Sequence, residues 1–448
     1  MAGILIRGCG IVTMNDERAV ISAGDLHIEN DRITHVGPAL AAPPAPERSD
    51  VEVIDGRGKV ALPGFVNAHH HLFMSLLRGM SPNDRLPGWL SGCILPAGVH
   101  LRPEDLYWSI RLSLAECIES GVTSTMDWSF NLHGSEHAAA TFEAMRDSGM
   151  RVHFAYGPGM VRSLSDFDIR IADFEDIRAR LFGGAERAGR IRLWAGLGGP
   201  ELQDETRFRE EFALARSYGL SVHIHLREVN ADSVGVVGKL DEWGVLGPHL
   251  LLAHAIHMND DELDILARTD TRVSYNPLSN MRLGSGICRT VEMRQRGMGV
   301  ALGLDGSACC DNNDFFALMR AAAGLQRARH MSADCVTVDD VLAMATVEGA
   351  RALGDGGDVG VLKPGAKADV ILINPDTINF APLNNFVAQT VFSGQPRNVD
   401  TVIVDGRVLK RGGQLAGTNV EEILAKCRAA SNHVVKAAGL ERTPILAV

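Results

Sequence analysis

The sequence predicts a (β/α)8 barrel joined to a small β-sandwich domain that both ends of the chain build together. Between about residues 60 and 360, apolar strand-like runs alternate with amphipathic helical runs. The two flanking segments instead contain short strands separated by turns. The chain has 448 residues, which is enough for one barrel of about 250 residues and an appended domain. We expect residues 59–361 to form the barrel, and residues 1–58 plus 362–448 to form the composite domain with a C-terminal helix.

The strands of the composite domain are expected in five short segments. Asn30-Asp31 and Asp405-Gly406 supply the turn chemistry of two tight hairpins within them. Both ends of the chain show the same pattern of short strands separated by turns, which predicts one β-domain made from both. The five segments are residues 4–14, 24–37, 51–62, 367–376 and 399–413.

Eight strand candidates lie in the middle of the chain, and helical runs such as residues 103–120 and 314–328 separate them. Eight strand–helix units in about 300 residues are typical of a (β/α)8 barrel. In that fold the active site lies at the C-terminal ends of the strands. The candidates are residues 60–69, 122–128, 151–158, 191–200, 220–228, 249–257, 271–277 and 299–306.

Composition and charge exclude several classes of protein. The formal net charge of -11 opposes binding to nucleic acid or to an anionic membrane surface, and no apolar run has the length of a membrane span. The first residues lack the pattern of a signal peptide, and eight cysteines without a C-x-x-C pair favour reduced thiols. We therefore expect a cytoplasmic protein with a small-molecule substrate. The helical run at residues 420–438 is a candidate contact with a second subunit, which would make the protein a homo-oligomer.

The stretch LPGFVNAHHHLFM carries three consecutive histidines at the end of the first barrel strand. Side chains alternate along a strand, so His69 and His71 share one face while His70 points to the other. A pair of imidazoles on one face can hold a metal ion, and a surface cluster of histidines is the alternative. The metal interpretation therefore depends on finding further ligands at other strand ends.

Further ligand-type residues do occur at those strand ends. His225 and Glu228 end the fifth candidate strand, His254 ends the sixth, and Asp305 ends the eighth. His223, two residues before His225, lies deeper in the barrel and is expected to be structural. Each residue alone is ambiguous, but together they indicate a catalytic metal site with His69, His71, His225 and Asp305 as ligands and with Glu228 and His254 beside them.

These motifs resemble the amidohydrolase superfamily, in the branch of aminohydrolases that act on aromatic heterocycles. That branch includes guanine deaminase, S-adenosylhomocysteine and methylthioadenosine deaminases, and atrazine chlorohydrolase. The resemblance covers nearly the whole chain. It rests on the motifs PGFVNAHHH, HLRE, AHAIH, YNPLSNMRLGSG, LGLDG and LKPGAKADVILI.

The resemblance implies one divalent metal ion per subunit, usually zinc and sometimes iron. Binuclear relatives bridge two metals through a carboxylated lysine on the fourth strand, and residues 191–200 contain no lysine. The implied catalytic residues are Glu228 as proton shuttle, His254 as a group that polarises water or stabilises the intermediate, and Asp305 as ligand and hydrogen-bond acceptor.

Two departures from the relatives bear on the substrate. Nucleoside-type deaminases place a glutamate that grips the ribose hydroxyls at a position that aligns with Gly98. The same relatives have a histidine against the purine where this chain has Glu201. Gly98 has no side chain that could bind a diol. The carboxylate of Glu201 can accept hydrogen bonds from a ring that presents N–H groups. Both departures favour an amino-substituted base such as a purine, pyrimidine, pterin or triazine, although Glu201 in solvent or paired with an arginine is an equal alternative.

Other candidate substrate contacts come from residues at neighbouring strand ends. Aromatic side chains there could stack on a flat ring, although core packing is their commoner role. Tyr275 stands where many relatives have histidine, and Cys309 and Cys310 are ordinary loop thiols or line the pocket. The candidates are Trp89, Trp128, Asn131, Tyr156 and Tyr275.

The predicted function is metal-dependent hydrolytic deamination of an N-heterocycle to its oxo form. One alternative is the displacement of chloride or an alkylamine from a triazine, which uses the same water and metal. Another is a nucleoside-type deaminase for methylthioadenosine or S-adenosylhomocysteine. A silent metal-binding scaffold is disfavoured, because a purely structural site needs no acid–base pair.

Overall fold

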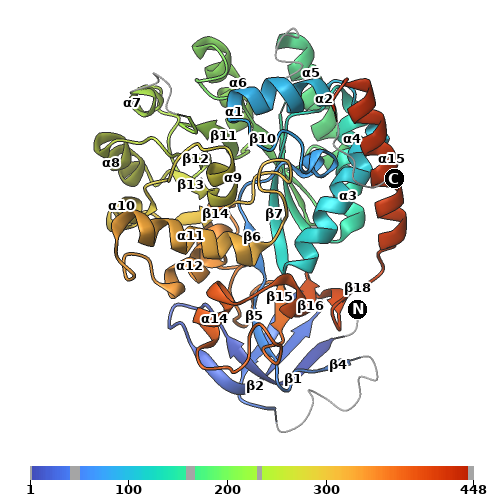
Figure 1. Cartoon of the computed structure of the whole chain (residues 1–448), viewed down its shortest axis with the longest axis vertical. Helices are drawn as coiled ribbons and strands as arrows, with labels where there is room; N and C mark the ends of the chain where they lie inside the picture. Colours follow the sequence, from blue (N-terminus) through green and yellow to red (C-terminus); the bar gives the residue numbers. More distant parts are fainter. Residues whose placement is uncertain (1–2, 41–50, 158–166, 230–234, 442–448) are drawn as a thin grey trace.

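The fold consists of a barrel surrounded by helices and a separate β-sheet at one end of it (Figure 1). The computed structural model describes residues 3–40, 51–157, 167–229 and 235–441. Each sheet has nine strands, and no strand is shared between them.

Eight parallel strands form the barrel, one in each of the segments that the sequence predicts. Backbone hydrogen bonds between the segments after the first and last strands close it, with Asp305 N donating to His69 O at 2.9 Å and His71 N to Asp305 O at 2.7 Å. The short β9 (Arg187–Ala188) pairs antiparallel with β10 at the edge. The barrel strands are β6 (Phe65–Asn67), β7 (Val122–Ser129), β8 (Arg151–Tyr156), β10 (Ile191–Gly196), β11 (Val222–Leu226), β12 (Leu250–His254), β13 (Arg272–Tyr275) and β14 (Val300–Leu302).

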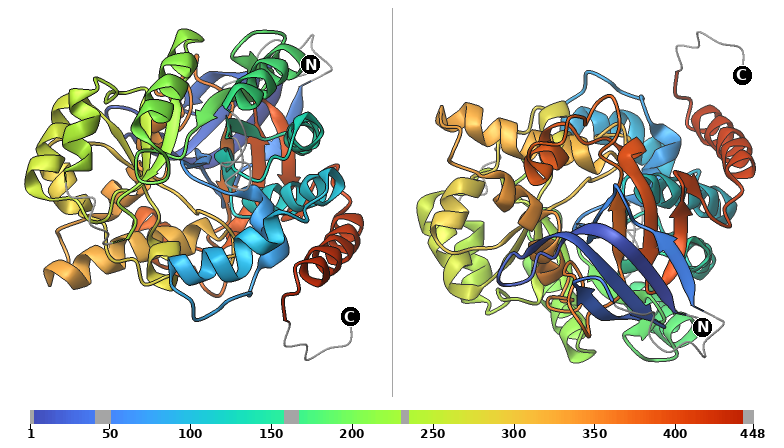
Figure 2. Two further views of the ribbon diagram at one scale, coloured as in Figure 1. Left: turned by 90° about the horizontal axis from the view of Figure 1, so that it is seen from above. Right: turned by 90° about the horizontal axis from the view of Figure 1, so that it is seen from below.

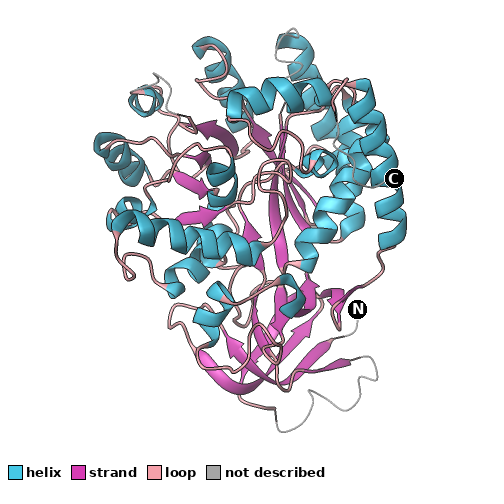
Figure 3. Cartoon of the chain, in the orientation of Figure 1, coloured by secondary structure: helices cyan, strands magenta, loops and turns pink. Residues whose placement is uncertain are grey.

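Helices surround the barrel on its outer side (Figures 2 and 3). Local sequence explains several of their starts, for example the capping box in which Asn259 Oδ1 accepts from Glu262 N at 2.8 Å. The helices of the described chain are η1 (Leu72–Leu77), α1 (Leu86–Trp89), η2 (Leu90–Ile94), α2 (Leu95–Gly98), α3 (Pro103–Glu119), α4 (Ser135–Ser148), α5 (Phe167–Phe182), α6 (Glu205–Ser217), α7 (Val236–Glu242), α8 (Asp260–Thr269), α9 (Pro277–Arg282), α10 (Thr290–Gln295), α11 (Phe315–His330), α12 (Val338–Met344), α13 (Val347–Ala352), α14 (Phe386–Phe392), η4 (Pro396–Asn398) and α15 (Val420–Ala437).

The second sheet combines strands from both ends of the chain. Its order is β18-β17-β16-β15-β5-β1-β2-β3, with β4 also paired to β1, so the predicted sandwich is one continuous sheet. Ala368 N, just before β15, donates to Asp31 O, between β2 and β3, at 2.9 Å, which shows that the sheet curves over itself. The strands are β1 (Ile4–Val12), β2 (Val20–Glu29), β3 (Arg32–Gly37), β4 (Glu52–Asp55), β5 (Val60–Pro63), β15 (Val370–Ile373), β16 (Val399–Val404), β17 (Arg407–Arg411) and β18 (Gln414–Leu415).

The predicted strand at residues 60–69 is in fact two strands in different sheets. Residues 60–63 form β5, which pairs with β1 and β15, and the barrel strand β6 begins only at Phe65. Gly64 lies between them and packs so closely on Thr123 that a Cβ atom there would overlap it. A break in an apolar run does not alter its periodicity, which is why the sequence predicts one strand here.

A buried ion-pair cluster joins the barrel to this sheet. Arg151 of β8 donates to Asp369 Oδ2 at 2.9 Å and to Asp405 Oδ1 at 3.0 Å, and Arg151 and Asp369 are both buried. Because β6 follows directly from β5, the N-terminal ends of the barrel strands face the sheet. Their C-terminal ends therefore lie at the opposite end of the barrel, away from it (Figure 1).

The C-terminal helix α15 packs along α3 of its own chain (Figure 1). Ser431 Oγ donates to Leu76 O at 2.7 Å, and Cys427 Sγ contacts Trp108 O at 3.1 Å. The buried face of this helix is thus used within the chain, and a homo-oligomer stays a prediction. Within the described residues, no helix is both long and apolar enough to cross a membrane.

Candidate active site

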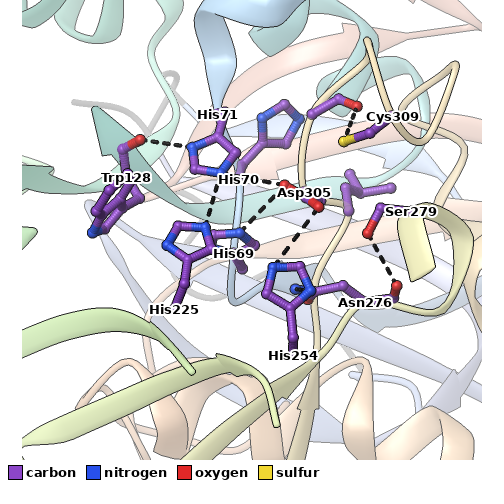
Figure 4. Close-up of polar contacts among 12 residues, drawn as sticks. His69, His70, His71, Trp128, His225, His254, Asn276, Ser279, Asp305 and Cys309 are labelled. Carbon is purple, nitrogen blue, oxygen red and sulfur yellow. Dashed lines mark hydrogen bonds and ion pairs between the residues drawn. The ribbon is translucent and has the colours of Figure 1, made fainter. Parts of the chain in front are cut away.

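Six ligand-type and acid–base side chains converge at the C-terminal ends of the barrel strands. Five of them are labelled in Figure 4, and Glu228 is the sixth. Asp305 Oδ1 lies 3.3 Å from both His69 Nε2 and His71 Nε2, and His71 Nε2 lies 3.2 Å from His225 Nε2. These are the four residues that the sequence analysis predicts as metal ligands. The structure also brings His254 and Glu228 beside them.

A chain of hydrogen bonds sets which nitrogen of His69 carries its proton. His223 Nδ1 lies 2.8 Å from Leu251 O, and a carbonyl can only accept, so Nδ1 of His223 is protonated. His223 Nε2 then accepts from His69 Nδ1 at 2.8 Å. His69 Nε2 is left with a bare lone pair, buried and without a hydrogen-bond partner among the described residues. His223, expected to be structural, therefore orients a candidate ligand.

His71 is oriented in the same way by a backbone carbonyl. Its Nδ1 donates to Trp128 O at 2.8 Å, so its Nε2 also presents a lone pair. Both lone pairs point at the same oxygen of Asp305, which is itself an acceptor. Acceptors at this separation repel one another unless a cation lies between them. The arrangement therefore fits a divalent metal ion.

The charges of the four candidate ligands match this interpretation. Burial lowers the pKa of His71, and it lowers the pKa values of His69 and His225 well below the usual range, so all three imidazoles are neutral. Burial would raise the pKa of Asp305, but the imidazoles that surround its carboxylate hold it well below its usual value. Three neutral imidazoles and one carboxylate are deprotonated ligands ready for a cation.

Glu228 and His254 form a second pair next to this group. His254 Nε2 lies 3.5 Å from Glu228 Oε2 and 4.0 Å from Asp305 Oδ2. Burial, together with the charges of Asp305 and Glu201, raises the pKa of Glu228 well above its ordinary value. Glu228 can therefore hold and release a proton at a pH where an exposed carboxylate would stay ionised.

Three of the strand ends have strained backbone. Arg227, His254 and Asp305 have φ values of 55°, 72° and 72°, in the left-handed region that non-glycine residues rarely adopt. Such strain concentrates at functional sites because it aims side chains that a relaxed strand end would not aim. Here it turns the chain sharply where the candidate catalytic groups point inward.

A cavity of about 210 Å³ opens onto these groups. His71, His225, His254, Glu228 and Asp305 form part of its wall. The rest of its wall is mostly apolar, and none of the described residues that line it is a lysine or an arginine. The apolar lining residues are Met74, Leu86, Trp89, Leu90, Trp128, Phe130, Leu202, Leu226, Val229 and Leu283.

Three of the predicted substrate contacts line this cavity. Trp128 and Trp89 are buried, and their indole N–H groups donate to His223 O and Ala308 O, which leaves their ring faces for packing. Glu201 is exposed and reaches the cavity from the loop after β10, and its Oε2 accepts from Arg227 N at 2.8 Å.

The other predicted contacts lie elsewhere in the structure. Among the described lining residues, Asn131, Tyr156 and Tyr275 are missing, as are both cysteines of the loop after Asp305. Tyr275 is fully buried, and burial together with the nearby Cys288 raises the pKa of its hydroxyl. Its position does not support a substrate contact, because Ser274 takes the inward-facing place on β13 and bonds Asn276. Asn131 is buried, and neither amide atom has a hydrogen-bond partner within the described chain.

The two cysteines of the loop after Asp305, Cys309 and Cys310, are both buried. Cys309 Sγ donates to Gly306 O and Cys310 Sγ to Asn312 O, each at 3.1 Å. Burial raises the pKa of both thiols well above the usual value, so neither is a reactive thiolate.

The end of the Asn131 side chain occupies the space beside Gly98. Gly98 is buried at the end of α2, and a Cβ atom there would lie 2.8 Å from Asn131 Oδ1. Its carbonyl contacts His133 Nε2 at 2.8 Å. A diol-gripping carboxylate at this position would therefore require Asn131 to move.

The sequence analysis missed the groups that orient the site. Asp127 Oδ1 accepts from Leu72 N at 2.9 Å, next to His71, and Asn276 and Asn280 contact His254 Nδ1. Asn276 and Asn280 belong to the motif YNPLSNMRLGSG but had no role assigned to them, and Asp127 had no signal beyond its place next to Trp128. His70 does point away, as expected, and its Nε2 contacts Asn313 Oδ1 at 3.0 Å.

The profile of the amidohydrolase family matches residues 60–409 of this chain. The chain belongs to the amidohydrolase family. Family membership makes this amidohydrolase an enzyme, a hydrolase acting on C–N bonds, as predicted from the sequence.

Curated relatives of this amidohydrolase extend over almost its whole length. It is 36% identical over 422 residues to 5'-deoxyadenosine deaminase of Methanothermobacter thermautotrophicus, covering 92% of this chain and 95% of the relative. It is 35% identical over 438 residues to 5-methylthioadenosine/S-adenosylhomocysteine deaminase of Pelotomaculum thermopropionicum, covering 96% and 98%.

Solved structures confirm the fold of this amidohydrolase. An atrazine chlorohydrolase from Arthrobacter aurescens, complexed with zinc, superimposes with a TM-score of 0.86 at 24% identity, covering 96% of this chain and 100% of that chain. An adenosine deaminase from Xanthomonas campestris with bound zinc gives a TM-score of 0.86 at 23% identity, covering 97% and 98%.

Proposed function

We propose that this chain is a metal-dependent hydrolytic deaminase that converts an amino-substituted N-heterocycle to its oxo form and releases ammonia. The observation that carries the proposal is the pair Glu228 and His254 placed beside four inward-pointing metal-ligand donors at the wall of a largely apolar cavity. The deaminases among its relatives support the same reaction.

We assign His69, His71, His225 and Asp305 as the ligands of one divalent ion, with zinc preferred over iron. Two donors that bind the same zinc ion through bonds of roughly 2.0–2.1 Å must lie within about 4.2 Å of each other. The separations of 3.2 Å and 3.3 Å between donors in this site lie within that limit. The zinc in the structural neighbours supports the choice.

The proposed reaction moves one water molecule and two protons. When bound, the metal ion lowers the pKa of water enough to supply hydroxide near neutral pH. Glu228 takes the proton that the water loses and passes it to the ring nitrogen beside the amino-bearing carbon, which makes that carbon electrophilic. Asp305 accepts a hydrogen bond from the attacking oxygen. As the C–O bond forms and the C–N bond breaks, the oxygen's second proton leaves with the amine as ammonia.

The cavity favours an uncharged, flat ring as substrate. An apolar cavity of about 150 Å³ can hold benzene, so about 210 Å³ suits a substituted ring. Trp89 and Trp128 supply aromatic faces, and Glu201 supplies a hydrogen-bond acceptor for ring or exocyclic N–H groups. Asn131, buried with both amide atoms unsatisfied within the described chain, stays a candidate contact.

A nucleoside is the second candidate substrate, because the curated relatives are named for deoxyadenosine and methylthioadenosine deamination. The tightly packed Gly98 argues against it, since this position offers no carboxylate for a ribose diol. A bare base needs no such contact and is therefore the first choice.

The test is ammonia release by zinc-loaded protein across a panel of amino-heterocycles. The panel contains guanine, 8-oxoguanine, cytosine, isocytosine, pterins, melamine, adenosine and methylthioadenosine. We expect release from at least one bare ring and none from the nucleosides. Release from the nucleosides alone would establish the second candidate. No ammonia release from any compound, with metal present, would favour displacement of chloride or an alkylamine from triazines.

Replacing Glu201 by glutamine is expected to raise KM for the active compound about tenfold with little change in kcat. The carboxylate contact is made equally in the bound substrate and in the transition state, and a hydrogen bond to a charged group contributes roughly 1.5–3 kcal/mol. Steady-state kinetics of Glu201→Gln and of Glu205→Gln, an exposed glutamate on α6, measure the difference. An unchanged KM in Glu201→Gln would show that Glu201 does not contribute to substrate binding.

A further inference from the structure

His254 is held on one side by two amide groups. Asn280 Nδ2 lies 2.9 Å and Asn276 Nδ2 lies 3.3 Å from His254 Nδ1. An amide nitrogen can only donate, so a ring nitrogen that faces two of them must accept and carries no proton. Asn276 is itself oriented by Ser274, whose Oγ donates to Asn276 Oδ1 at 2.9 Å.

The other side of the ring faces two carboxylates. His254 Nε2 lies 3.5 Å from Glu228 Oε2 and 4.0 Å from Asp305 Oδ2, and an ionised carboxylate only accepts hydrogen bonds. The carboxylates therefore decide which ring nitrogen of His254 donates and which accepts. Asn280 alone would not decide it. Its Oδ1 has no partner within the described chain, so exchanging its amide oxygen and nitrogen would leave as many groups hydrogen-bonded.

The positions of the two asparagines follow from the segment Asn276-Pro-Leu-Ser-Asn280. Asn276 precedes the first residue of α9, and Asn280 follows four residues later on the same face of the helix. Asn280 N donates to Asn276 O at 3.1 Å, and Ser279 Oγ donates to the same carbonyl at 3.2 Å (Figure 4). The start of the helix thus presents both amides to one imidazole.

We infer that Asn276 and Asn280 are positioning residues that fix His254 as the neutral tautomer with its proton on Nε2. His254 then donates a hydrogen bond to the oxygen that attacks the ring, and it cannot take a proton from that oxygen. This inference rests on the proposed function for its role in the reaction, while the tautomer itself is a property of the folded chain.

The inference divides the acid–base work between the two residues. The separations of 3.5 and 4.0 Å exceed those of strong hydrogen bonds, so the Nε2 proton is available to an oxygen placed between His254, Glu228 and Asp305. A donor aimed at this point stabilises the negative charge that grows on the oxygen in the transition state. Glu228 is left as the proton acceptor of the pair.

The direct test reads the tautomer by nitrogen NMR of zinc-loaded protein labelled with ¹⁵N-histidine. Long-range proton–nitrogen correlations separate protonated from unprotonated ring nitrogens, and the spectrum of His254→Gln identifies the signals of His254 by their loss. We expect an unprotonated Nδ1 and a protonated Nε2 in the wild-type protein. A protonated Nδ1 in the wild-type protein overturns the inference.

Two variants test the role of the amides. Asn280→Asp replaces a donor by an acceptor, so Nδ1 should become protonated and kcat should fall by about 10²- to 10⁴-fold, with KM changed less than threefold. Asn280→Leu removes the donor but leaves Asn276, so the tautomer should persist and kcat should fall about tenfold. An unchanged Nδ1 signal in Asn280→Asp contradicts the inference.

A matched control separates these effects from the cost of a buried charge. Asn398 is fully buried in a remote amide network, so Asn398→Asp should lower stability but leave the His254 signals and kcat unchanged. The experiment also separates the two proposals. The wild-type spectrum decides the tautomer even if no panel compound releases ammonia. If the protein releases ammonia but His254 Nδ1 is protonated, the inference on the tautomer is refuted and the proposed function stands.

Discussion

Glu228→Gln is expected to reduce kcat by about 10²- to 10⁴-fold while the metal content stays at one ion per subunit. Glutamine keeps the size and hydrogen-bonding reach of the side chain but cannot carry a proton from water to the ring nitrogen. Burial and the neighbouring Asp305 raise the pKa of Glu228, which suits a group that must both take and give a proton. Steady-state kinetics and metal analysis of the same preparation measure both quantities.

The control for this variant is Glu211→Gln. Glu211 is a buried glutamate on α6 that pairs with Arg207 and does not line the cavity, so its loss tests the general effect of removing a buried carboxylate. We expect wild-type kcat in this control. Activity of Glu228→Gln within tenfold of wild type would contradict the shuttle, and a lost metal ion would instead make Glu228 a ligand.

Much of the fold could be predicted because the sequence patterns of its strands and of its helices are both strong. Buried parallel strands read as apolar runs, and amphipathic helices separate them with a different period. The hairpins were equally readable, since Asn30 and Asp405 adopt positive φ where turn residues are needed. The change of sheet at Gly64 was not predictable, because it depends on a close approach to Thr123 that no local pattern records.

The candidate site was predictable to the extent that its residues terminate strands. His69, His225 and Asp305 could be placed together because the C-terminal ends of barrel strands meet at one rim. Tyr275 was chosen by analogy with a motif, whereas alternation along β13 places Ser274 on the inward-facing side.

The cavity wall was mostly not predictable. Its apolar residues, such as Leu86, Leu202 and Leu283, come from short helices and loops whose packing is decided by tertiary contacts. The amides on His254 are a similar case, since only the fold brings the start of α9 against the end of β12. Substrate identity depends on these walls, so it was the weakest part of the sequence analysis.

Removing the metal with a chelator is expected to reduce turnover at least about a hundredfold, because the water then keeps the pKa of bulk water. One equivalent of zinc should restore it, and iron(II) added without oxygen shows whether iron also serves. His225→Ala removes one of four donors and should lower metal content along with activity. His153→Gln, which removes a buried barrel histidine paired with Asp355, is the control and should keep its metal.

The metal should also stabilise the folded chain, which gives a measurement independent of turnover. An ion that binds only the folded state, present at a hundred times its Kd, raises the free energy of unfolding by about 2.7 kcal/mol. The lone pairs of His69 and His71 converge on one carboxylate oxygen, so the cation relieves a repulsion present in the metal-free fold. We expect zinc to raise the melting temperature of the wild-type protein and of Glu228→Gln equally, and that of His225→Ala much less. An equal rise in all three would place the metal outside this site.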